Sequence, residues 1–330
     1  MGSVPDCRET PPPACPICLA DEWSLHYADL QDRLLGVPGG YCFWLCAECG
    51  VGRLWPLPDD LSAYYPEEYS AYIAPLVEVG LTRPWHKKEW ELSFGAEGML
   101  RSAARNRLKV NEIARLLWQC LDDGYAPQSF LDYGSGTGRA LRFAEQLGMK
   151  AVGVDASDNT LEAARATGLD LRVGSYENLP LQGETFDVIH LSHVLEHVVE
   201  PVEALTALRT HMSDRGRILV MVPNAGSGLS DLFGADWFQL DAPRHLWGLT
   251  PHSLELAMER AGFSVVKKIF NGAGHAIYES MRYALERSGS SHALPEPPNL
   301  DVLAGFEGLA SYWNAQEAGD AMIMVGKVKE

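Results

Sequence analysis

A glycine-rich turn near the middle of the chain restricts the fold more than any other feature of the sequence. The segment Phe130–Gly138 consists of an apolar run, the acid Asp132, and three glycines separated by single residues. The apolar run predicts a buried strand, and we expect a helix to begin near Arg139. Glycine has no Cβ, so the backbone of the turn can approach a ligand closely. The N-terminus of the following helix offers free N–H groups. Such a turn is typical of open α/β sheets that hold nucleotide-like ligands at the carboxyl ends of their strands.

The glycine spacing differs from two better-known nucleotide motifs. The run is G-x-G-x-G, whereas the dinucleotide fingerprint is G-x-G-x-x-G and the phosphate loop requires Gly-Lys-Ser/Thr. By itself it is equally compatible with a plain turn between a strand and a helix. Its surroundings favour a ligand site, because a second apolar run, Ala151–Val154, ends in Asp155. That carboxylate can accept hydrogen bonds from both hydroxyls of a ribose, the alternative being a surface acid after a strand.

These segments resemble the class I S-adenosylmethionine (SAM)-dependent methyltransferases, and the resemblance extends from about residue 100 to the C-terminus. Tyr133 departs from the family pattern, in which Ile, Val or Leu is more usual at that position. The matching segments, in family order, are Leu131–Gly138 for the first motif, Gly153–Ser157 for the second strand and its ribose-binding acid, Gly174–Pro180 for the segment beside the adenine, Phe186–His197 for the fourth strand and its turn, and Gly216–Asn224 for the fifth strand.

The alternation of strands and helices predicts a doubly wound, mostly parallel α/β sheet, and the resemblance implies seven strands in a Rossmann-like arrangement. The resemblance also implies SAM as the methyl donor. The expected strands are 128–133, 150–155, 171–173, 186–191, 216–222, 263–270 and 322–328, and the expected helices are 96–121, 138–147, 158–167, 201–212 and 251–261. The residues implied to bind SAM are Asp132, Gly134, Ser135, Gly136, Gly138, Asp155, Ala156, Tyr176, Glu177, Ser192 and His193.

Two C-x-x-C pairs form a second strong signal near the N-terminus. Cys15, Cys18, Cys46 and Cys49 predict a closed, structural zinc site, because four thiolates leave no open position for water. The gap between the pairs is longer than in most zinc ribbons and predicts a hairpin that turns at 36–40. Free thiols and disulfides are the alternatives, and disulfides fit poorly with a cytoplasmic chain. The remaining cysteines, Cys7, Cys42 and Cys120, are expected to be ordinary residues.

We therefore expect three regions. Residues 1–55 form the zinc-ribbon-like module, which resembles the N-terminal module of bacterial methyltransferases of sugar, surface-glycan or natural-product biosynthesis. Residues 56–95, rich in Pro, Trp and Tyr, form a connector. Residues 96–330 form the methyltransferase domain, with an insertion at 272–318.

Three histidines are candidates for the general base that an acceptor hydroxyl would need. His193 and His197 follow the fourth strand, and His245 lies in a loop after the fifth. Histidine suits proton transfer near neutral pH. His193 is also expected to line the cofactor pocket, and Asp241 and Arg244 have the alternative of pairing only to hold their loop.

The segment His193–His197 also matches H-x-x-E-H, an inverted zinc-peptidase motif. That interpretation requires both histidines on a long helix. The preceding strand and the nearby Pro201 argue against it.

The charge composition limits the chemical class of the acceptor. Lys plus Arg total 27 and Asp plus Glu total 44, a net charge of −17, which disfavours nucleic acid and anionic lipid as partners. Neither an apolar run of membrane-spanning length nor a signal-peptide pattern is present, so a cytoplasmic location is expected. We expect methyl transfer to a small-molecule or glycan-precursor acceptor, with O-methylation favoured over C- or N-methylation. An RNA methyltransferase and a non-catalytic scaffold of the same fold are the rivals. The oligomeric state cannot be inferred.

Overall fold

The computed structural model describes residues 7–58, 60–65, 127–165, 168–290, 292, 294–295 and 300–329. These residues form two compact units. The first contains the described parts of Met1–Pro66, Ser192–Thr206 and Val220–Lys329. The second contains those of Glu67–Leu191 and Ala207–Leu219. The predicted helix at 96–121 and most of the predicted connector lie outside the described residues.

In the part of the chain that the structure describes, the larger sheet has seven strands in the order β10-β11-β8-β7-β4-β5-β6. β4 pairs in parallel with both β5 and β7, β5 pairs in parallel with β6, and β10 pairs antiparallel with β11. This mostly parallel sheet confirms the predicted fold class. Its strands are β4 (Ser129–Tyr133), β5 (Lys150–Asp155), β6 (Leu171–Val173), β7 (Phe186–Ser192), β8 (Met212–Pro223), β10 (Phe263–Phe270) and β11 (Ala321–Val328).

The central strands form because they carry nearly continuous apolar runs. Phe130 and Leu131 of β4, and Val188 and Ile189 of β7, are completely buried. Parallel strands are covered on both faces, so such runs are typical of them. The chain passes outward from β4 through β5 to β6 and then returns to β7 on the other side of β4. This reversal makes the β4–β7 edge the topological switch point, where open α/β sheets bind their ligands.

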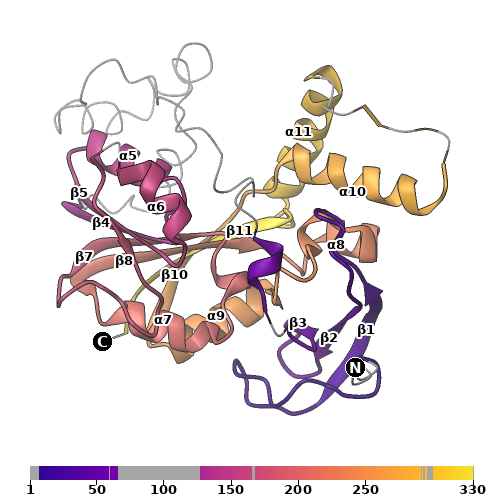
Figure 1. The fold of residues 1–330 in the computed structure, drawn as a ribbon, viewed down its shortest axis with the longest axis horizontal. Coiled ribbons are helices and arrows are strands. Elements are labelled where there is room, and N and C mark those ends of the chain that lie inside the picture. The colour runs from indigo at the N-terminus through magenta and orange to yellow at the C-terminus, as the bar shows by residue number, and fades with distance from the viewer. Residues whose placement is uncertain are drawn as a thin grey trace. The chain divides into compact units, whose positions relative to one another are not determined.

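Helices follow the strands largely as predicted. In the second unit, α5 (Arg139–Gln146) and α6 (Asp158–Arg165) pack against β4, β5 and β6, as Figure 1 shows. In the first unit, α9 (Pro251–Arg260) packs against β10 and β11. Its start is fixed by a capping box in which the Thr250 hydroxyl accepts a hydrogen bond from the Ser253 N–H. α7 (Pro201–Arg209) ends earlier than predicted, because the chain enters β8 at Met212.

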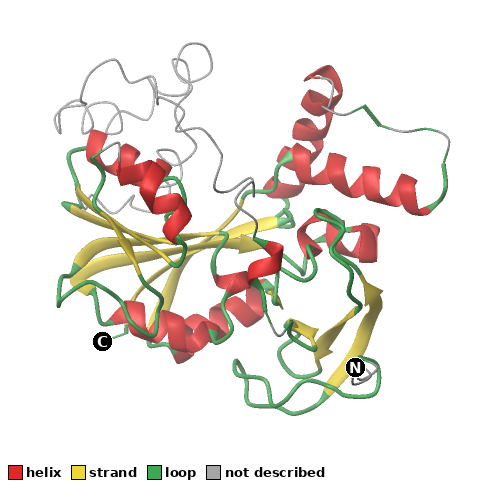
Figure 2. Cartoon of the chain, viewed as in Figure 1, coloured by secondary structure: helices red, strands yellow, loops and turns green. Residues whose placement is uncertain are grey.

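A smaller four-stranded sheet, with the order β1-β2-β3-β9, belongs to the first unit (Figure 2). β1 (Trp23–Leu30) and β2 (Tyr41–Cys46) are antiparallel and enclose the predicted hairpin turn. β3 (Gly52–Trp55) and β9 (Trp247–Gly248) were not expected. Both are too short to show a hydrophobic period, and β9 is held by pairing with β3.

The predicted insertion contains two helices, α10 (Gly274–Arg287) and α11 (Leu300–Ala315), which contact each other. Ile277 and Ala310 are buried with Leu229 of the short helix α8 (Gly228–Phe233), which the sequence analysis did not predict. None of the helices in the described ranges is long and apolar enough to cross a membrane.

One expectation about the cysteines is wrong. Cys7 and Cys42 are not the ordinary residues that the sequence predicts, because the structure joins them in a disulfide with a Cα–Cα distance of 5.6 Å. The bond packs against Trp44 in a small apolar cluster. Sequence spacing gave no signal for this pair, because the two positions approach only when β2 has formed. Cys120 lies outside the described residues.

Candidate functional site

The glycine-rich turn after β4 is built from left-handed backbone. Gly134, Gly136 and Gly138 have φ values of 77°, 49° and 77°. Residues with a Cβ rarely adopt this region, so glycine is required by conformation. The N–H groups of Gly134 and Ser135 donate to the Val154 carbonyl at 2.8 and 3.2 Å, which fixes the turn against the end of β5.

Asp155 organises this turn from the end of β5. Its Oδ2 accepts a hydrogen bond from the Gly136 N–H at 2.8 Å, and its Oδ1 accepts one from the Ser157 N–H at 2.9 Å. Burial raises the pKa of Asp155 above its ordinary value, although these N–H donors oppose the shift. The Ala156 N–H also donates to this carboxylate. A carboxylate has about four lone-pair sites, so the group can still accept a hydroxyl donor.

Two features of the turn suit a polar ligand. The Ser135 Oγ is buried and has no hydrogen-bond partner among the described residues. A Cβ at Gly153 would lie 2.8 Å from that oxygen and 2.4 Å from Leu171 Cδ2, so only glycine fits beside the turn. An orphaned hydroxyl, left-handed glycines and a carboxylate at a switch point fit an adenosyl ligand with its ribose and charged tail.

Asp132 has a partner that was not predicted. It is 4% exposed, and its Oδ1 lies 2.7 Å from His190 Nδ1. The two residues are register partners on β4 and β7, directly at the switch point. His190 was not predicted, because a single histidine in a strand carries no motif. Its signal was positional: it stands two residues before the end of β7, opposite Asp132.

The adenine-side prediction concerns Tyr176 and Glu177, and Ala156 belongs to the ribose-side segment. The Tyr176 N–H donates to the Tyr133 hydroxyl at 3.0 Å, which fastens the segment after β6 to the end of β4. Tyr133, the residue that departs from the family pattern, therefore has a structural partner. Glu177 and Ala156 are exposed.

The remaining candidates, with Ser192, lie in the first unit. Ser192 ends β7, and His193 follows it with φ 54°, an uncommon conformation for a non-glycine residue. His193 Nδ1 lies 3.1 Å from Glu196 Oε1. The His193 side chain is 36% exposed, whereas that of Glu196 is 1% exposed. An accessible imidazole is thus held by a buried carboxylate.

His197 and His245 lie beside this pair, with ring centroids 4.7 Å apart. Burial, and then the neighbouring His245, lower the pKa of His197 to about 4, so its ring is neutral at pH 7. Burial alone would raise the pKa of Glu196, but the hydrogen bond from His193 and the three histidines hold it at about 2. The group therefore combines an ionised carboxylate with at least one neutral imidazole.

The loop that carries His245 is held by a buried ion-pair network. Arg244 is completely buried, and its Nε donates to Asp241 Oδ2 at 2.9 Å, as the pairing hypothesis for these two residues anticipated. Its Nη2 also donates to Asp32 Oδ1 at 2.9 Å. Asp32 was not predicted, because only the tertiary structure brings it to this loop.

The arrangement differs from the inverted zinc-peptidase motif. Leu195–His197 is a single 3₁₀ turn, so His193 and His197 do not share a long helix. In this segment the residues grouped closely enough to share a metal ion are Glu196 and His197, together with His245 from the later loop, whereas His193 bonds Glu196.

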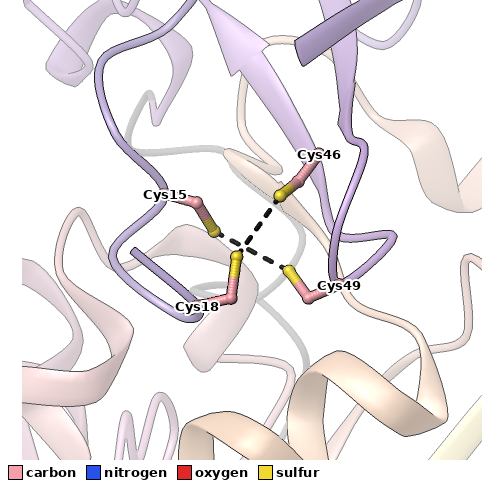
Figure 3. Close-up of side chains that lie close together, drawn as sticks. All are labelled: Cys15, Cys18, Cys46 and Cys49. Atoms are coloured by element: carbon pink, nitrogen blue, oxygen red, sulfur yellow. Dashed lines mark hydrogen bonds between the residues drawn. The ribbon is translucent and has the colours of Figure 1, made fainter. Parts of the chain in front are cut away.

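The four cysteines of the N-terminal module come together in the first unit. Figure 3 shows their side chains pointing toward one another, with Cys15 Sγ 3.8 Å from Cys49 Sγ and Cys18 Sγ 3.4 Å from Cys46 Sγ. These distances exclude disulfides, which need about 2.05 Å. Zinc–sulfur bonds of about 2.3 Å give a tetrahedron with edges of about 3.8 Å, so the site fits the ion.

The two C-x-x-C turns have the same backbone geometry. The Leu19 N–H donates to the Cys15 carbonyl at 2.8 Å, and the Gly50 N–H donates to the Cys46 carbonyl at 3.0 Å. Leu19 and Gly50 have matching φ values of 70° and 68°. A hydrogen bond from Cys49 lowers the pKa of the Cys15 thiol to about 5, although its burial opposes the shift.

Comparison with known proteins identifies relatives of this arrangement. The family model described as "Methyltransferase domain" matches residues 103–268. The ubiquinone biosynthesis O-methyltransferase of Ruegeria sp. is 32% identical over 165 residues, 46% of this chain and 67% of that protein. The protein of the same name from Dinoroseobacter shibae is 33% identical over 156 residues, 43% of this chain and 63% of that protein. The chain thus spans about two thirds of these relatives or slightly less.

Solved structures give a more distant similarity. A SAM-dependent methyltransferase from Archaeoglobus fulgidus has 21% sequence identity and a TM-score of 0.44, and the match covers 65% of this chain and 92% of that one. One from Clostridium acetobutylicum has 12% identity and a TM-score of 0.45, with 70% and 96% covered.

Proposed function

The chain belongs to the methyltransferase-domain family and is a SAM-dependent methyltransferase, and from this premise we propose that it methylates a hydroxyl oxygen of a small-molecule or sugar-containing acceptor. SAM supplies a sulfonium methyl that is already activated. The protein must therefore orient the acceptor and remove the hydroxyl proton. The observation that carries the choice of oxygen is the hydrogen bond between the accessible His193 and the buried Glu196.

The glycine turn and Asp155 are proposed to hold SAM. Gly134, Gly136 and Gly138 allow close approach of the backbone, and Ser135 supplies an unpaired hydroxyl. Asp155 would accept hydrogen bonds from the ribose hydroxyls with its remaining lone pairs. We also propose that SAM is contacted by the remaining predicted residues, Asp132, Ala156, Tyr176, Glu177, Ser192 and His193.

Calorimetric titration with SAM and S-adenosylhomocysteine tests this assignment. We expect Asp155→Ala to weaken binding at least about tenfold, because it removes the ribose acceptor and frees the Gly136 N–H. Asp170→Ala is the matched control, since this carboxylate is 46% exposed and pairs with Arg172. Equal affinities for wild type and Asp155→Ala would overturn the assignment.

His193 is the proposed base among the three histidine candidates. Its Nδ1–H donates to Glu196 Oε1, and we propose Nε2 as the nitrogen that takes the acceptor proton. The acceptor oxygen then forms a bond to the methyl carbon while the carbon–sulfur electron pair returns to sulfur. His197 suits this role less well, because a pKa of about 4 makes it a weak base at neutral pH. The curated relatives at 32–33% identity are named O-methyltransferases, which supports oxygen as the acceptor atom.

Transfer of labelled methyl from SAM to a panel of phenols, sugars, amines and RNA tests the reaction. We expect hydroxyl acceptors to be labelled, and His193→Gln to lower kcat by about 10²–10⁴-fold with SAM affinity retained. His252→Gln, an exposed histidine on α9, is the control. Labelling of amines alone would establish the N-methyltransferase alternative, and labelling of RNA alone the nucleic-acid alternative. SAM binding without transfer to any acceptor would favour the scaffold.

Zinc is proposed for the four-cysteine group. Cys15, Cys18, Cys46 and Cys49 would bind it as thiolates and close the ends of β1, β2 and β3 around it. Four thiolates leave no position for substrate, so this ion would stabilise the module without entering the reaction.

A further inference from the structure

A second cluster of potential metal ligands lies outside the cysteine module. Glu196, His197 and His245 each offer one ligand atom, and these atoms lie within 4.8 Å of one another. All three belong to the first unit. Glu196 and His197 come from the 3₁₀ turn after β7, and His245 comes from the loop held by Arg244. The cluster therefore combines two imidazoles with one carboxylate from segments about 50 residues apart.

The hydrogen bonds of both histidines fix the same ring nitrogen as the donor. His197 Nδ1 lies 2.9 Å from the Arg244 carbonyl oxygen and 2.9 Å from the Tyr65 hydroxyl oxygen, which can also accept. His245 Nδ1 lies 2.7 Å from the Gln239 carbonyl oxygen. A carbonyl only accepts, so each Nδ1 carries the hydrogen and each neutral ring keeps a lone pair on Nε2. Metal-binding histidines are usually oriented in this way, by donating the other N–H to a backbone carbonyl or carboxylate.

Glu196 has a buried carboxylate oxygen that no hydrogen bond satisfies among the described residues. The residue is 0% exposed, and its Oε1 is engaged by His193. Its Oε2 is fully buried and has no hydrogen-bond partner among the residues that the structure describes. A buried carboxylate oxygen normally contacts a hydrogen-bond donor or a cation, because burying it without a partner costs the free energy of its hydration.

We propose that Glu196 Oε2, His197 Nε2 and His245 Nε2 bind one divalent first-row transition-metal ion, with zinc as the reference ion. Two imidazoles and a carboxylate suit zinc, iron or manganese, whereas magnesium and calcium prefer oxygen ligands alone. Three protein ligands leave an open position, unlike the closed set of four cysteines. His193 bonds the other oxygen of Glu196 and so orients this ligand from outside the site.

The binding claim stands without the O-methylation proposed above, and only the role of the ion rests on it. In that role the ion would make an acceptor hydroxyl more acidic before His193 takes its proton. His197 and His245 would then serve as ligands, and the three histidine candidates would have different tasks.

Metal content of the full-length protein tests the proposal. After dialysis against zinc and removal of excess ion, we expect two zinc ions per wild-type chain and one per chain in Glu196→Gln and in His245→Gln. His211→Gln is the matched control, because His211 Nδ1 also donates to a backbone carbonyl, that of Glu184 at 2.8 Å. This control should retain two ions. A wild-type content of one zinc that disappears in Cys46→Ser would overturn the proposal, as would two ions in both cluster variants.

Cobalt titration of the wild type gives an answer that does not depend on folding of the variants. One equivalent of Co²⁺ at the cysteines produces intense thiolate-to-metal charge-transfer absorption. A second equivalent at Glu196, His197 and His245 should bind without adding to that absorption. Saturation after a single thiolate-bound equivalent would contradict the site. If the second metal ion does not bind but labelled methyl is still transferred, the metal site is wrong and the proposed function is retained. If the second ion binds but no methyl is transferred, the metal site is retained and the proposed function is wrong.

Discussion

Arg244 and Asp32 form a completely buried ion pair, with Nη2 and Oδ1 2.9 Å apart and both side chains at 0% exposure. The residues are 212 positions apart in the sequence. Asp32 also accepts hydrogen bonds from the N–H groups of Leu34 and Leu35, each at 3.1 Å. The pair therefore joins the turn after β1 to the loop that carries His245, and this loop supplies one of the proposed metal ligands.

Asp32→Ala is expected to lower the free energy of unfolding by about 3–5 kcal/mol, because it leaves a buried guanidinium without one of its carboxylates. Asp170→Ala is the control, since Asp170 is 46% exposed in its pair with Arg172. Exposed pairs contribute about 1 kcal/mol or less. Urea unfolding of both variants measures the difference. Similar decreases in the free energy of unfolding would show that the buried ion pair stabilises the protein no more than an exposed one.

Gly138 and Gly148 stand at the two ends of α5 and offer a matched test of the glycine turn. Both are left-handed, with φ 77° and 83°, so alanine at either position costs about 1–2 kcal/mol in backbone strain. A Cβ at Gly138 would also lie 2.6 Å from Leu169 Cδ1, whereas one at Gly148 would meet nothing within 4 Å. We expect Gly138→Ala to cost about 1–3 kcal/mol more than Gly148→Ala, from overpacking.

Denaturant unfolding and SAM titration of both alanine variants check this expectation. Only Gly138→Ala should also weaken SAM binding, because it distorts the turn that is proposed to hold the cofactor. Equal stability and equal SAM affinity in the two variants would show that the turn tolerates a side chain.

Asp320 should make the stability of the protein depend on pH. Its burial raises its pKa to about 6, and its Oδ1 has no hydrogen-bond partner among the described residues. Because the folded pKa lies above the ordinary value, the folded protein binds the proton more tightly. The stabilisation is full below about pH 4 and is lost as the pH rises through 6, a change of about 2–3 kcal/mol.

Asp320→Asn should remove this part of the pH dependence. The free energy of unfolding of the variant, relative to wild type, should therefore be higher at pH 7 than at pH 4. Thermal unfolding across that range measures it. Asp214→Asn, at an exposed position, is the control and should follow the wild-type curve. A wild-type difference between pH 4 and 7 that persists in Asp320→Asn would refute the assignment.

Removal of the proposed structural zinc should destabilise the N-terminal module. Cys46→Ser should lose one zinc ion per chain and lower the free energy of unfolding by about 5 kcal/mol or more, since metal binding contributes to folding. Cys42→Ser, in the same strand β2 but outside the group of four, breaks the disulfide with Cys7 and should still keep its zinc, so it is the control for zinc content. Elemental analysis with unfolding curves decides the matter, and an unchanged zinc content in Cys46→Ser would exclude the site.

Much of the fold could be predicted from the sequence, because the information is local. The buried strands β4, β5 and β7 are continuous apolar runs, and α9 begins with a Thr-Pro cap, so backbone preference and periodicity were sufficient. The two C-x-x-C pairs likewise predicted a four-thiol group, since each pair already brings two ligands to one turn. The division into regions at residues 55 and 95 stays a prediction.

Only the tertiary structure decided which distant side chains meet. Asp132 and His190 become partners because β4 and β7 are neighbours in register, and Glu196 meets His245 because a buried Arg244 holds the second loop in place. No local pattern encodes these distances, since a side chain's partner across the fold depends on strand order and loop path. The sequence alone thus determined the longer strands and helices, the glycine turn and the resemblance to the family. The packing of those elements decided which carboxylate faces which histidine, because burial forces each charged group to find its partner there.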